Sequence, residues 1–338
     1  MKKSIILIAL ALLGLNLQAQ QKVALHHNGV TEIYDGVNSF IQAYDSAIAG
    51  DTVYLSGGVF SAPSNINKRL TIYGAGHYPD TTKATRSTVI TGTINIYQDA
   101  DSTFIEGLEL SDISIPSNHK VDYLTISRCI LGSFTMSGNQ TNPCQYLTFK
   151  ENIVGGINLA SGANSIISNN IIIRQIYNGN QNAFYNNILL YESAPNNSTR
   201  YVMNNVTNCV VANNIFRLVR YNNYPLSGST NVISNNVNVA NTTGTSNLYS
   251  NNYTYPIVDS IFVNHLGNAF SYDDDFHLDS AGVYLGVDST QVGIYGGLYP
   301  WKESSVPSIP HIIYKKIPDA VEPNGTLDIE IKVNAEDY

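Results

Sequence analysis

Three ionisable residues stand at matching positions in a repeated stretch of the chain. Glu106, Arg128 and Glu151 each come directly before the slot that anchors one repeat. An arginine base beside carboxylates could remove a proton from an acidic sugar, and close carboxylates could hydrolyse a glycosidic bond. The same column could instead form an outward-facing ladder of salt bridges, which requires no chemistry. We favour the ladder and keep the acid–base column as the alternative.

Arginines and tyrosines follow the anchors further along the chain. Arg174 and Tyr191 each lie four residues past an anchor, so stacking of the repeats would make them neighbours. Arginine binds carboxylates through paired hydrogen bonds, and aromatic rings stack on flat partners. The group would therefore suit a glycan ligand, although a solvated outer surface is the interpretation we favour. Its members are Arg174, Tyr177, Tyr191, Arg217, Arg220, Tyr221 and Tyr224.

Metal and thiol chemistry have little support in the sequence. The run formed by Asp273, Asp274 and Asp275 could bind Ca²⁺, but an acidic triplet alone does not define such a site, and we expect no other cofactor. The cysteines show no zinc-type spacing with histidine. We expect buried free thiols and leave their pairing open, since an oxidising compartment would permit a disulfide. The cysteines are Cys129, Cys144 and Cys209.

Composition narrows the range of partners. The net charge is −8, and charged residues make up 13% of the chain, against about 25% in ordinary proteins. No basic stripe is present, which disfavours nucleic acid. An exterior of Asn, Ser, Thr, Gly and Tyr suits a polysaccharide or cell-surface component instead. Between Asn152 and Val258 the only acidic residue is Glu192, which counts against catalysis in the central repeats.

One short phrase recurs from Phe104 to Tyr253: an apolar residue, two polar residues, usually an asparagine, and then Ile or Val. The run from Ile167 to Ile171 is a typical copy. Its anchor slots are 16 to 27 residues apart, and a unit of this size indicates a solenoid. The anchors are Gly107, Cys129, Asn152, Asn170, Asn187, Asn214, Asn236 and Asn252.

The segments between the anchors predict strands and turns. They are rich in Ile, Val, Tyr and Thr and contain no long amphipathic helical run. Leu124–Leu131 fits part of a leucine-rich repeat, but later units do not, and the unit lengths vary too much. We therefore predict an all-β, right-handed parallel β-helix, with coils about 4.8 Å apart. The longest step predicts a loop around 193–200.

The asparagine anchors are expected to have a structural role. Asparagine tolerates the left-handed conformation of a tight turn, and stacked carboxamides can hydrogen-bond to one another along the axis. The predicted ladder consists of Asn152, Asn170, Asn187, Asn214, Asn236 and Asn252.

Several further motifs carry a resemblance to a known family. They are Gly50–Leu55, Gly58–Phe60, Leu70–Gly76, Asp275–Leu278 and Val292–Gly297. With these and the repeated phrase, nearly the whole mature chain resembles the pectin-lyase-like right-handed β-helix proteins exported by Bacteroidetes-type bacteria. The resemblance implies the fold but no single reaction, because that family includes lyases, hydrolases, esterases and proteins without known catalysis.

Four parts are predicted along the chain: a signal peptide (1–19), an N-terminal cap with the first strand (20–60), the β-helix (61–299), and a Pro-rich linker with C-terminal strands (300–338). Two lysines precede the apolar run Ile5–Leu17, which is typical of a secretory signal cleaved after Ala19. We therefore expect export to the periplasm, the cell surface or the medium. No transmembrane segment is expected in the mature chain, and the oligomeric state stays open.

The two ends of the β-helix have different sequence patterns. Apolar residues at helical spacing between Gly36 and Gly50 predict a short helix that caps the N-terminal end. Strands are predicted after it over Asp51–Leu55, Leu70–Tyr73 and Thr88–Tyr97. Alternating residues over Leu327–Val333 predict a half-buried strand, which could pair with Ile312–Tyr314 and fold back on the solenoid. Attachment to a partner is the alternative.

Two functions remain. The first is an exported, non-catalytic protein that binds glycan or forms part of a surface assembly, and it predicts no converging carboxylates. The second is a polysaccharide lyase or glycoside hydrolase acting on an acidic polysaccharide. It predicts a groove in which carboxylates, or carboxylates with Lys or Arg, reach one sugar. We favour the first.

Overall fold

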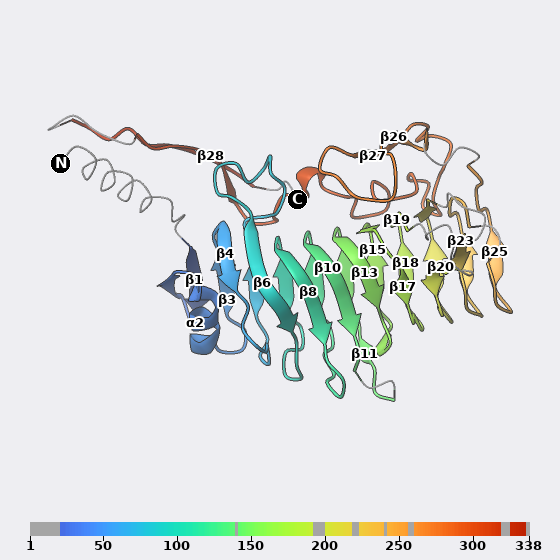
Figure 1. Ribbon diagram of the computed structural model, residues 1–338, viewed down its shortest axis with the longest axis horizontal. Coiled ribbons are helices and arrows are strands. Elements are labelled where there is room, and N and C mark those ends of the chain that lie inside the picture. The colour runs from blue at the N-terminus through green and yellow to red at the C-terminus, as the bar shows by residue number, and fades with distance from the viewer. Residues whose placement is uncertain are drawn as a thin grey trace, which may run out of the picture.

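The chain folds as a parallel β-solenoid (Figure 1). The computed structural model describes residues 21–138, 141–191, 200–217, 223–239, 242–255, 260–318 and 325–335. The predicted signal peptide and almost all of the predicted loop at 193–200 lie outside these residues. Within them α2 (Ser39–Ser46) is the only α-helix, and a 3₁₀ helix spans Glu303–Ser305. The predicted all-β class is confirmed.

Two long sheets form the described part of the solenoid. The first begins with an antiparallel hairpin, β2 (Val30–Asp35) and β1 (Lys22–His27). It continues in parallel order through β3 (Thr52–Leu55), β5 (Thr71–Tyr73), β7 (Phe104–Glu106), β9 (Thr125–Ser127), β12 (Thr148–Lys150), β15 (Ile166–Ser168), β18 (Ala183–Tyr185), β21 (Val210–Ala212), β24 (Val232–Ser234) and β25 (Leu248–Ser250).

The second sheet runs alongside the first. It consists of β4 (Gly58–Ser61), β6 (Thr88–Asn95), β8 (Glu109–Ile115), β10 (Ile130–Met136), β13 (Ile153–Asn158), β16 (Ile171–Ile172), β19 (Ile188–Leu189) and β22 (Ile215–Phe216), with a branch from β13 through β17 (Ile176–Tyr177), β20 (Arg200–Asn204) and β23 (Asn223–Leu226). Short pairs are β11 (Cys144–Gln145) with β14 (Gly162–Ala163), and β26 (Phe262–Asn264) with β27 (Asp275–Leu278).

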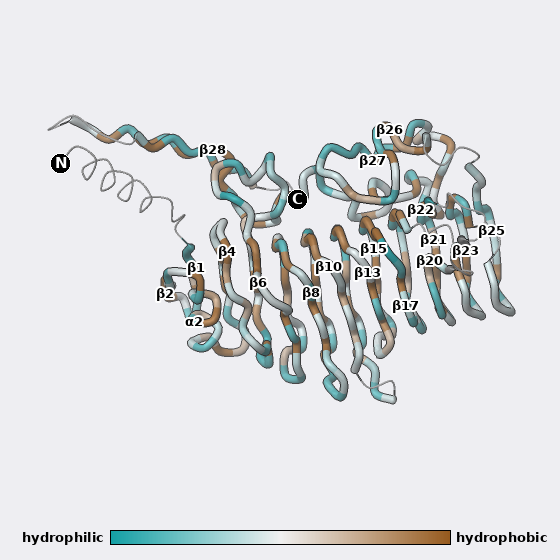
Figure 2. The backbone as a smooth tube through the Cα atoms, viewed as in Figure 1, coloured by the Kyte–Doolittle hydropathy of each residue, from teal (hydrophilic) through white to brown (hydrophobic). Residues whose placement is uncertain are grey.

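Stacking places equivalent apolar residues in columns that fill the interior. Ile167 pairs in register with Phe184, and Phe184 with Val211. The middle residue of each strand in the first sheet is at most 1% exposed from Val53 through Ile233. Figure 2 shows the hydrophobic segments recurring from coil to coil. Each coil therefore buries its apolar face against its neighbours, as a solenoid requires.

The predicted asparagine ladder is present. The amide Nδ2 of Asn170 donates to Oδ1 of Asn187 over 2.9 Å, and the backbone N–H of Asn170 donates to the same oxygen over 3.0 Å. The same pair of bonds repeats along the ladder from Asn152 to Asn252. A second, unpredicted ladder runs parallel to it through Ser165, Asn182, Cys209, Asn231 and Asn247.

The left-handed turn belongs to the residue before each ladder asparagine, which corrects the prediction. Asn169 has φ 55° and Asn186 has φ 55°, whereas Asn170 and Asn187 are not left-handed. Arg128 and Glu151 occupy the same left-handed position in earlier coils, with φ 50° and 57°. The two properties ascribed to one asparagine are therefore divided between neighbours: the first makes the turn, and the second forms the ladder.

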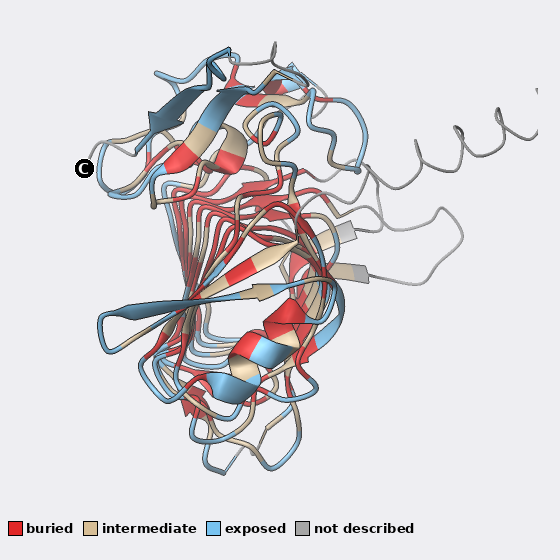
Figure 3. Cartoon of the chain, turned by 90° about the vertical axis from the view of Figure 1, so that its left-hand side faces the viewer, coloured by how far each residue is buried: buried red, intermediate tan, exposed pale blue. Residues whose placement is uncertain are grey.

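The N-terminal end of the solenoid is closed. The predicted helix is confirmed as α2, and it lies across this end in Figure 3, which looks along the solenoid from the N-terminal side. Phe40 and Ala43 of α2 are fully buried. The hairpin of β1 and β2 was not predicted, and β1 extends the sheet by pairing antiparallel with β3.

The C-terminal part of the chain returns along one face of the coils. After β25 it passes through β26 and β27 and runs back toward the N-terminal end (Figure 1). Residues 285–308 of this C-terminal segment lie over the column of left-handed residues that includes Arg128, Glu151 and Asn169. We call residues 285–308 the cover. The Nδ2 group of Asn169 donates to the carbonyl oxygens of Ile294 and Gly296, both over 2.9 Å. Sequence patterns predicted closing coils here but not this contact.

The predicted C-terminal hairpin is confirmed as β28 (His311–Lys316) paired antiparallel with β29 (Glu330–Asn334). The expected half-burial of the second strand is wrong, because every residue of β29 is exposed. Ile331 is 50% and Val333 59% exposed. Most of the hairpin therefore extends away from the coils (Figure 1), whereas His311 at the start of β28 is buried.

Candidate functional site

The predicted acid–base column is not a single column. Glu106 pairs in register with Ser127, one residue before Arg128. The residue that aligns with Arg128 is Gly107, since its N–H bonds to Ser127 O as that of Arg128 bonds to Lys150 O. The anchor assigned to Gly107 was therefore one residue too early. The lack of an asparagine in this early repeat left its register undetermined by sequence.

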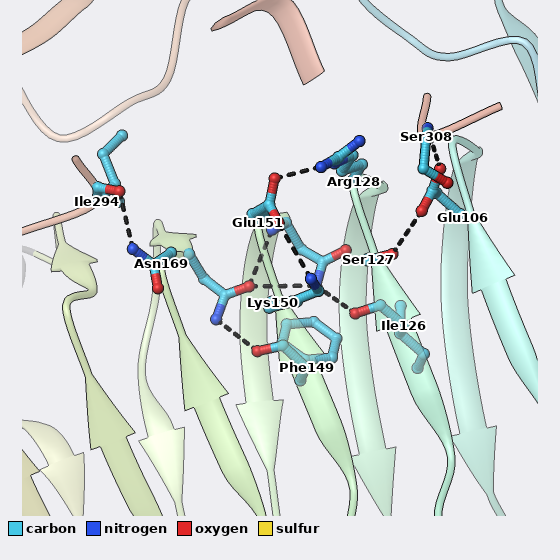
Figure 4. Close-up of polar contacts among 12 residues, drawn as sticks. Glu106, Ile126, Ser127, Arg128, Phe149, Lys150, Glu151, Asn169, Ile294 and Ser308 are labelled. Carbon is cyan, nitrogen blue, oxygen red and sulfur yellow. Dashed lines mark hydrogen bonds and ion pairs between the residues drawn. The ribbon is translucent and has the colours of Figure 1, made fainter. Parts of the chain in front are cut away.

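Arg128 and Glu151 form a buried ion pair beneath the cover. The Nε of Arg128 lies 2.9 Å from Oε2 of Glu151, and Lys150 Nζ lies 3.5 Å from Oε1 (Figure 4). Arg128 is 5% and Glu151 2% exposed. The Nη1 group of Arg128 also donates to the carbonyl oxygen of Val306 in the cover over 2.8 Å.

Glu106 is also buried beneath the cover and accepts two hydrogen bonds there. Ser127 Oγ donates to its Oε2 over 3.1 Å, and the N–H of Ser308 donates to its Oε1 over 2.6 Å (Figure 4). Its exposed fraction is 3%. The three residues therefore stabilise contacts between the coils and the C-terminal segment, and they face the cover instead of solvent. The side chains point away from the interior of the coils, as the salt-bridged ladder predicted, but the cover buries them.

The described members of the predicted arginine and tyrosine group differ in their surroundings. Arg174 and Tyr177 are exposed, and Tyr177 donates its hydroxyl hydrogen to Gln175. Tyr191 packs against the core, and Arg217 is buried. Tyr224 lies beside Tyr201, with ring centroids 5.6 Å apart. Arg220 and Tyr221 lie outside the described residues.

The carboxylates of Asp274 and Asp275 in the acidic triplet have different hydrogen-bond partners. Asp274 lies 3.2 Å from His265 Nδ1 and accepts the N–H of Ser271. Asp275 accepts the backbone N–H of His277, which lowers the pKa of that carboxyl. No group of three potential metal ligands occurs among the residues that the structure describes. A calcium site at Asp273–Asp275 stays a prediction.

All three cysteines are buried free thiols. Burial raises the pKa of Cys129 to about 12 and that of Cys209 to about 11. Cys209 Sγ accepts the N–H of Asn182 over 3.3 Å, so its sulfur replaces a carboxamide oxygen in the second ladder. The cysteines therefore serve packing and hydrogen bonding, and the raised pKa values keep them unreactive near neutral pH.

A groove at the N-terminal third of the solenoid was missed by sequence reasoning. It encloses about 810 Å³. Tyr54–Gly57 and Tyr73–Ala75 form its floor, Lys83–Arg86 form one wall, and Ile309–Ile317 form the other. Four segments, the last more than 200 residues after the others, thus build one concave surface, which we call the tyrosine groove.

Local packing holds the floor and one wall of the tyrosine groove together. Tyr54 and Tyr73 are paired in register on adjacent strands, and their rings stack with centroids 5.5 Å apart and planes 15° apart. Gly57 is required beneath the wall, because a Cβ there would lie 1.9 Å from the carbonyl oxygen of Thr85. Tyr54 remains 39% exposed and presents aromatic surface to the groove.

Four cationic side chains line the tyrosine groove. Its lining contains Lys22 from β1, Lys83 and Arg86 from the loop after β5, and Lys315 from β28. No Asp or Glu is present among its described lining residues. Asp35 lies 2.5 Å from Lys22 and Asp80 lies 2.6 Å from Lys83 at exposed positions, where ion pairs are weak and exchange readily. In a chain with a net charge of −8, this is a local concentration of cations.

The sequence offered only a partial signal for this site. Tyr54 and Tyr73 follow the inward residues Val53 and Ile72 in two predicted strands, so their outward direction could have been read from alternation. The contributions of Lys83, Arg86 and Lys315 depend on a loop and on the returning C-terminal chain, whose positions no local pattern determines.

No protein-family model matches the chain, and no curated protein sequence matches it. None of the helices in the described ranges has the length and apolar character needed to cross a membrane. The class of the protein is therefore defined by its architecture, a parallel β-helix with one α-helix at its N-terminal end and a returning C-terminal segment.

Proposed function

We propose that this chain is an exported, non-catalytic glycan-binding protein of the pectin-lyase-like β-helix type, and that the tyrosine groove binds an acidic polysaccharide. The observation that carries the proposal is the combination of stacked Tyr54 and Tyr73 rings with four cationic side chains in one groove. Aromatic rings bind the apolar faces of sugars, and Lys and Arg bind carboxylate or sulfate groups.

The absence of a catalytic role rests on the surroundings of the acid and base candidates. Glu106, Arg128 and Glu151 are at most 5% exposed; Glu106 and Arg128 bond to the cover, and Glu151 pairs with Arg128. A general acid or base must come within hydrogen-bond reach of its substrate. The groove itself brings no carboxylate to its described lining, which leaves it without the acidic groups that a glycosidase needs.

Export is supported by the sequence of residues 1–19. Two lysines, an apolar run and a small residue before the cleavage position match a secretory signal. An exported protein meets the polysaccharides of cell surfaces and of the surrounding medium. N-terminal sequencing of the protein secreted or released by its host would test this part, with cleavage after Ala19 as the expected result.

The binding test compares acidic and neutral polysaccharides by titration calorimetry. We expect binding of uronate- or sulfate-bearing chains that weakens as salt rises, because salt screens exposed charges. Arg86→Ala with Lys315→Ala should weaken binding at least about tenfold, the equivalent of 1.4 kcal/mol. Tyr54→Ala should weaken it by a similar factor.

The matched control is a second pair of stacked tyrosines remote from the groove lining. Tyr123 and Tyr146 are exposed, with ring centroids 4.9 Å apart. Tyr123→Ala with Tyr146→Ala should leave binding unchanged. Equal losses in both tyrosine variants would contradict the groove as the site, and unsaturated products or new reducing ends would establish the lyase or hydrolase alternative.

A further inference from the structure

The C-terminal end of the solenoid exposes its own interior. The column of inward residues is at most 1% exposed from Val53 to Ile233, and it ends at Tyr249, which is 51% exposed. Tyr249 pairs in register with Ile233, so it occupies the same inward position without a coil above it. The neighbouring Leu248 is 68% exposed.

The hydrogen bonding of the ladders is also incomplete at this end. In each earlier coil a ladder N–H donates to a side-chain oxygen of the next coil, as Asn236 does to Asn252 over 2.9 Å and Asn231 does to Asn247 over 2.9 Å. The N–H groups of Asn247 and Asn252 have no such acceptor among the described residues. Strand β25 likewise pairs on one side only, with β24.

The described residues at the open end carry none of the features that usually prevent pairing between strand edges. Natural edge strands are usually protected by charged residues, proline or a covering element. Residues 226–239 and 242–255 contain no Asp, Glu, Lys, Arg or Pro. The other edge of the same sheet, β2, carries Glu32 and Asp35 and lies beside α2. The two ends of the solenoid are therefore protected in opposite ways.

We infer that the open end is an interface with a second copy of this chain, formed by pairing β25 with β25 of the other copy. A strand edge with unpaired N–H and C=O groups is completed best by another strand. Two copies that each carry a charge of −8 repel least through a surface without charges. Pairing of identical edges about a two-fold axis closes the assembly at two copies.

The difference between the N-terminal end and the open end of the solenoid also argues against a filament. Head-to-tail stacking would require β25 of one copy to pair with β2 of the next, and β2 presents acidic side chains on a twisted hairpin. The two-fold arrangement leaves α2 and the N-terminal hairpin at the two outer ends of an elongated dimer.

Analytical ultracentrifugation of the mature chain tests the inference. We expect an elongated dimer whose dissociation constant changes little with salt, because no charged pair contributes. Tyr249→Lys should raise the dissociation constant at least about tenfold, since it places a buried charge at the centre of the interface. Leu266→Lys adds the same charge at a side chain that is 78% exposed and should leave the dimer intact.

Leu248→Lys is the second edge variant, and circular dichroism would verify that each variant is folded. Leu248 is already 68% exposed, so this substitution spares the fold of one copy while placing charge on the edge. A wild-type chain that stays monomeric throughout the micromolar range would overturn the inference. Equal dissociation constants for Leu248→Lys and Leu266→Lys would overturn it as well.

Discussion

Asn169 and Asn170 are adjacent in sequence and stabilise different parts of the molecule. Asn170 points inward, where its Nδ2 donates to Phe149 O and to Asn187 Oδ1, both over 2.9 Å. Asn169 takes the left-handed turn and donates to Ile294 and Gly296 in the cover, 125 and 127 residues further along the chain. One column thus holds coil to coil, and the other holds the coils to the returning segment.

The difference between the two columns explains their compositions. Each amide of the asparagine ladder bonds to the amide of the next coil, so a substitution in one coil leaves its neighbours unpaired. The outward column needs only donors and acceptors that match the backbone of the cover, and Arg128 supplies such a bond to Val306 O as readily as asparagine does elsewhere. All six positions of the predicted ladder are therefore asparagine, whereas the outward column also accommodates Arg128 and Glu151.

The largest predicted effect is the loss of one inward amide. Asn187→Ala removes the acceptor of two bonds from Asn170 and the donor to Ile167 O and Asn214 Oδ1. Because unsatisfied buried groups cost about 1–3 kcal/mol each, we expect the free energy of unfolding to fall by about 4 kcal/mol. Chemical denaturation measures it.

The control for this substitution is Asn164→Ala. Asn164 is exposed, has a left-handed φ of 51° and lies outside both ladders. Its substitution should cost about 1 kcal/mol or less, since only the backbone preference is lost. Similar losses for Asn164 and Asn187 would show that the ladder bonds contribute no more than a turn does.

A smaller loss is expected in the outward column, at Glu151. Glu151→Gln leaves the buried guanidinium of Arg128 without its charged partner at 2.9 Å. Breaking one side of a buried pair costs about 3 kcal/mol, and chemical denaturation would again measure the change. Binding of acidic polysaccharide should stay unchanged, because Glu151 does not line the tyrosine groove.

The double variant Arg128→Met with Glu151→Gln sharpens the comparison. It removes both charges, so at least half of the lost stability should return, as replacement of a buried pair by neutral groups is often nearly neutral. No recovery would mean that the contact of Arg128 with Val306 O, and not its pairing with Glu151, fixes the cover to the coils.

The inward column could be predicted from sequence and the outward contacts could not. The repeated Asn-Asn-Ile phrase identifies the ladder because each bond joins residues 16 to 27 positions apart in matching contexts. The contacts of Asn169 and Arg128 with the cover join residues 125 to 178 positions apart, in segments without a shared pattern. The repeated sequence phrase therefore predicts the coils, whereas the path of the C-terminal segment depends on tertiary packing.

The same reasoning explains the errors at the two ends of the chain. The register of Glu106 was wrong because its repeat has Gly107 and Leu108 where later repeats have two asparagines. Strand β29 shows the alternation of a half-buried strand, yet both of its faces are exposed. Alternation indicates the two faces of a strand, but it does not indicate whether a neighbour covers one of them.

The last prediction concerns the pH dependence of stability, which should differ between the asparagine ladder and the contacts with the C-terminal segment. The ladder amides do not titrate, whereas the contacts between the coils and the returning C-terminal segment include His77, whose Nδ1 lies 3.2 Å from the Tyr272 hydroxyl. Burial lowers the pKa of His77 from 6.5 to about 3. The unfolded chain therefore binds a proton at this residue between pH 6.5 and pH 3 while the folded chain does not, so its contribution to stability is complete above pH 6.5 and falls as the pH is lowered.

His77→Phe should remove this dependence, because phenylalanine fills the space beside Tyr78 and Tyr272 without titrating. Relative to the variant, the wild-type chain should lose at most about 1.4 kcal/mol per pH unit below pH 6.5, measured by denaturation at several pH values. The difference between Asn187→Ala and the wild type should stay constant over the same range. A constant difference for His77→Phe as well would mean that His77 is protonated in the folded chain and that its surroundings beside Tyr78 and Tyr272 tolerate the charge.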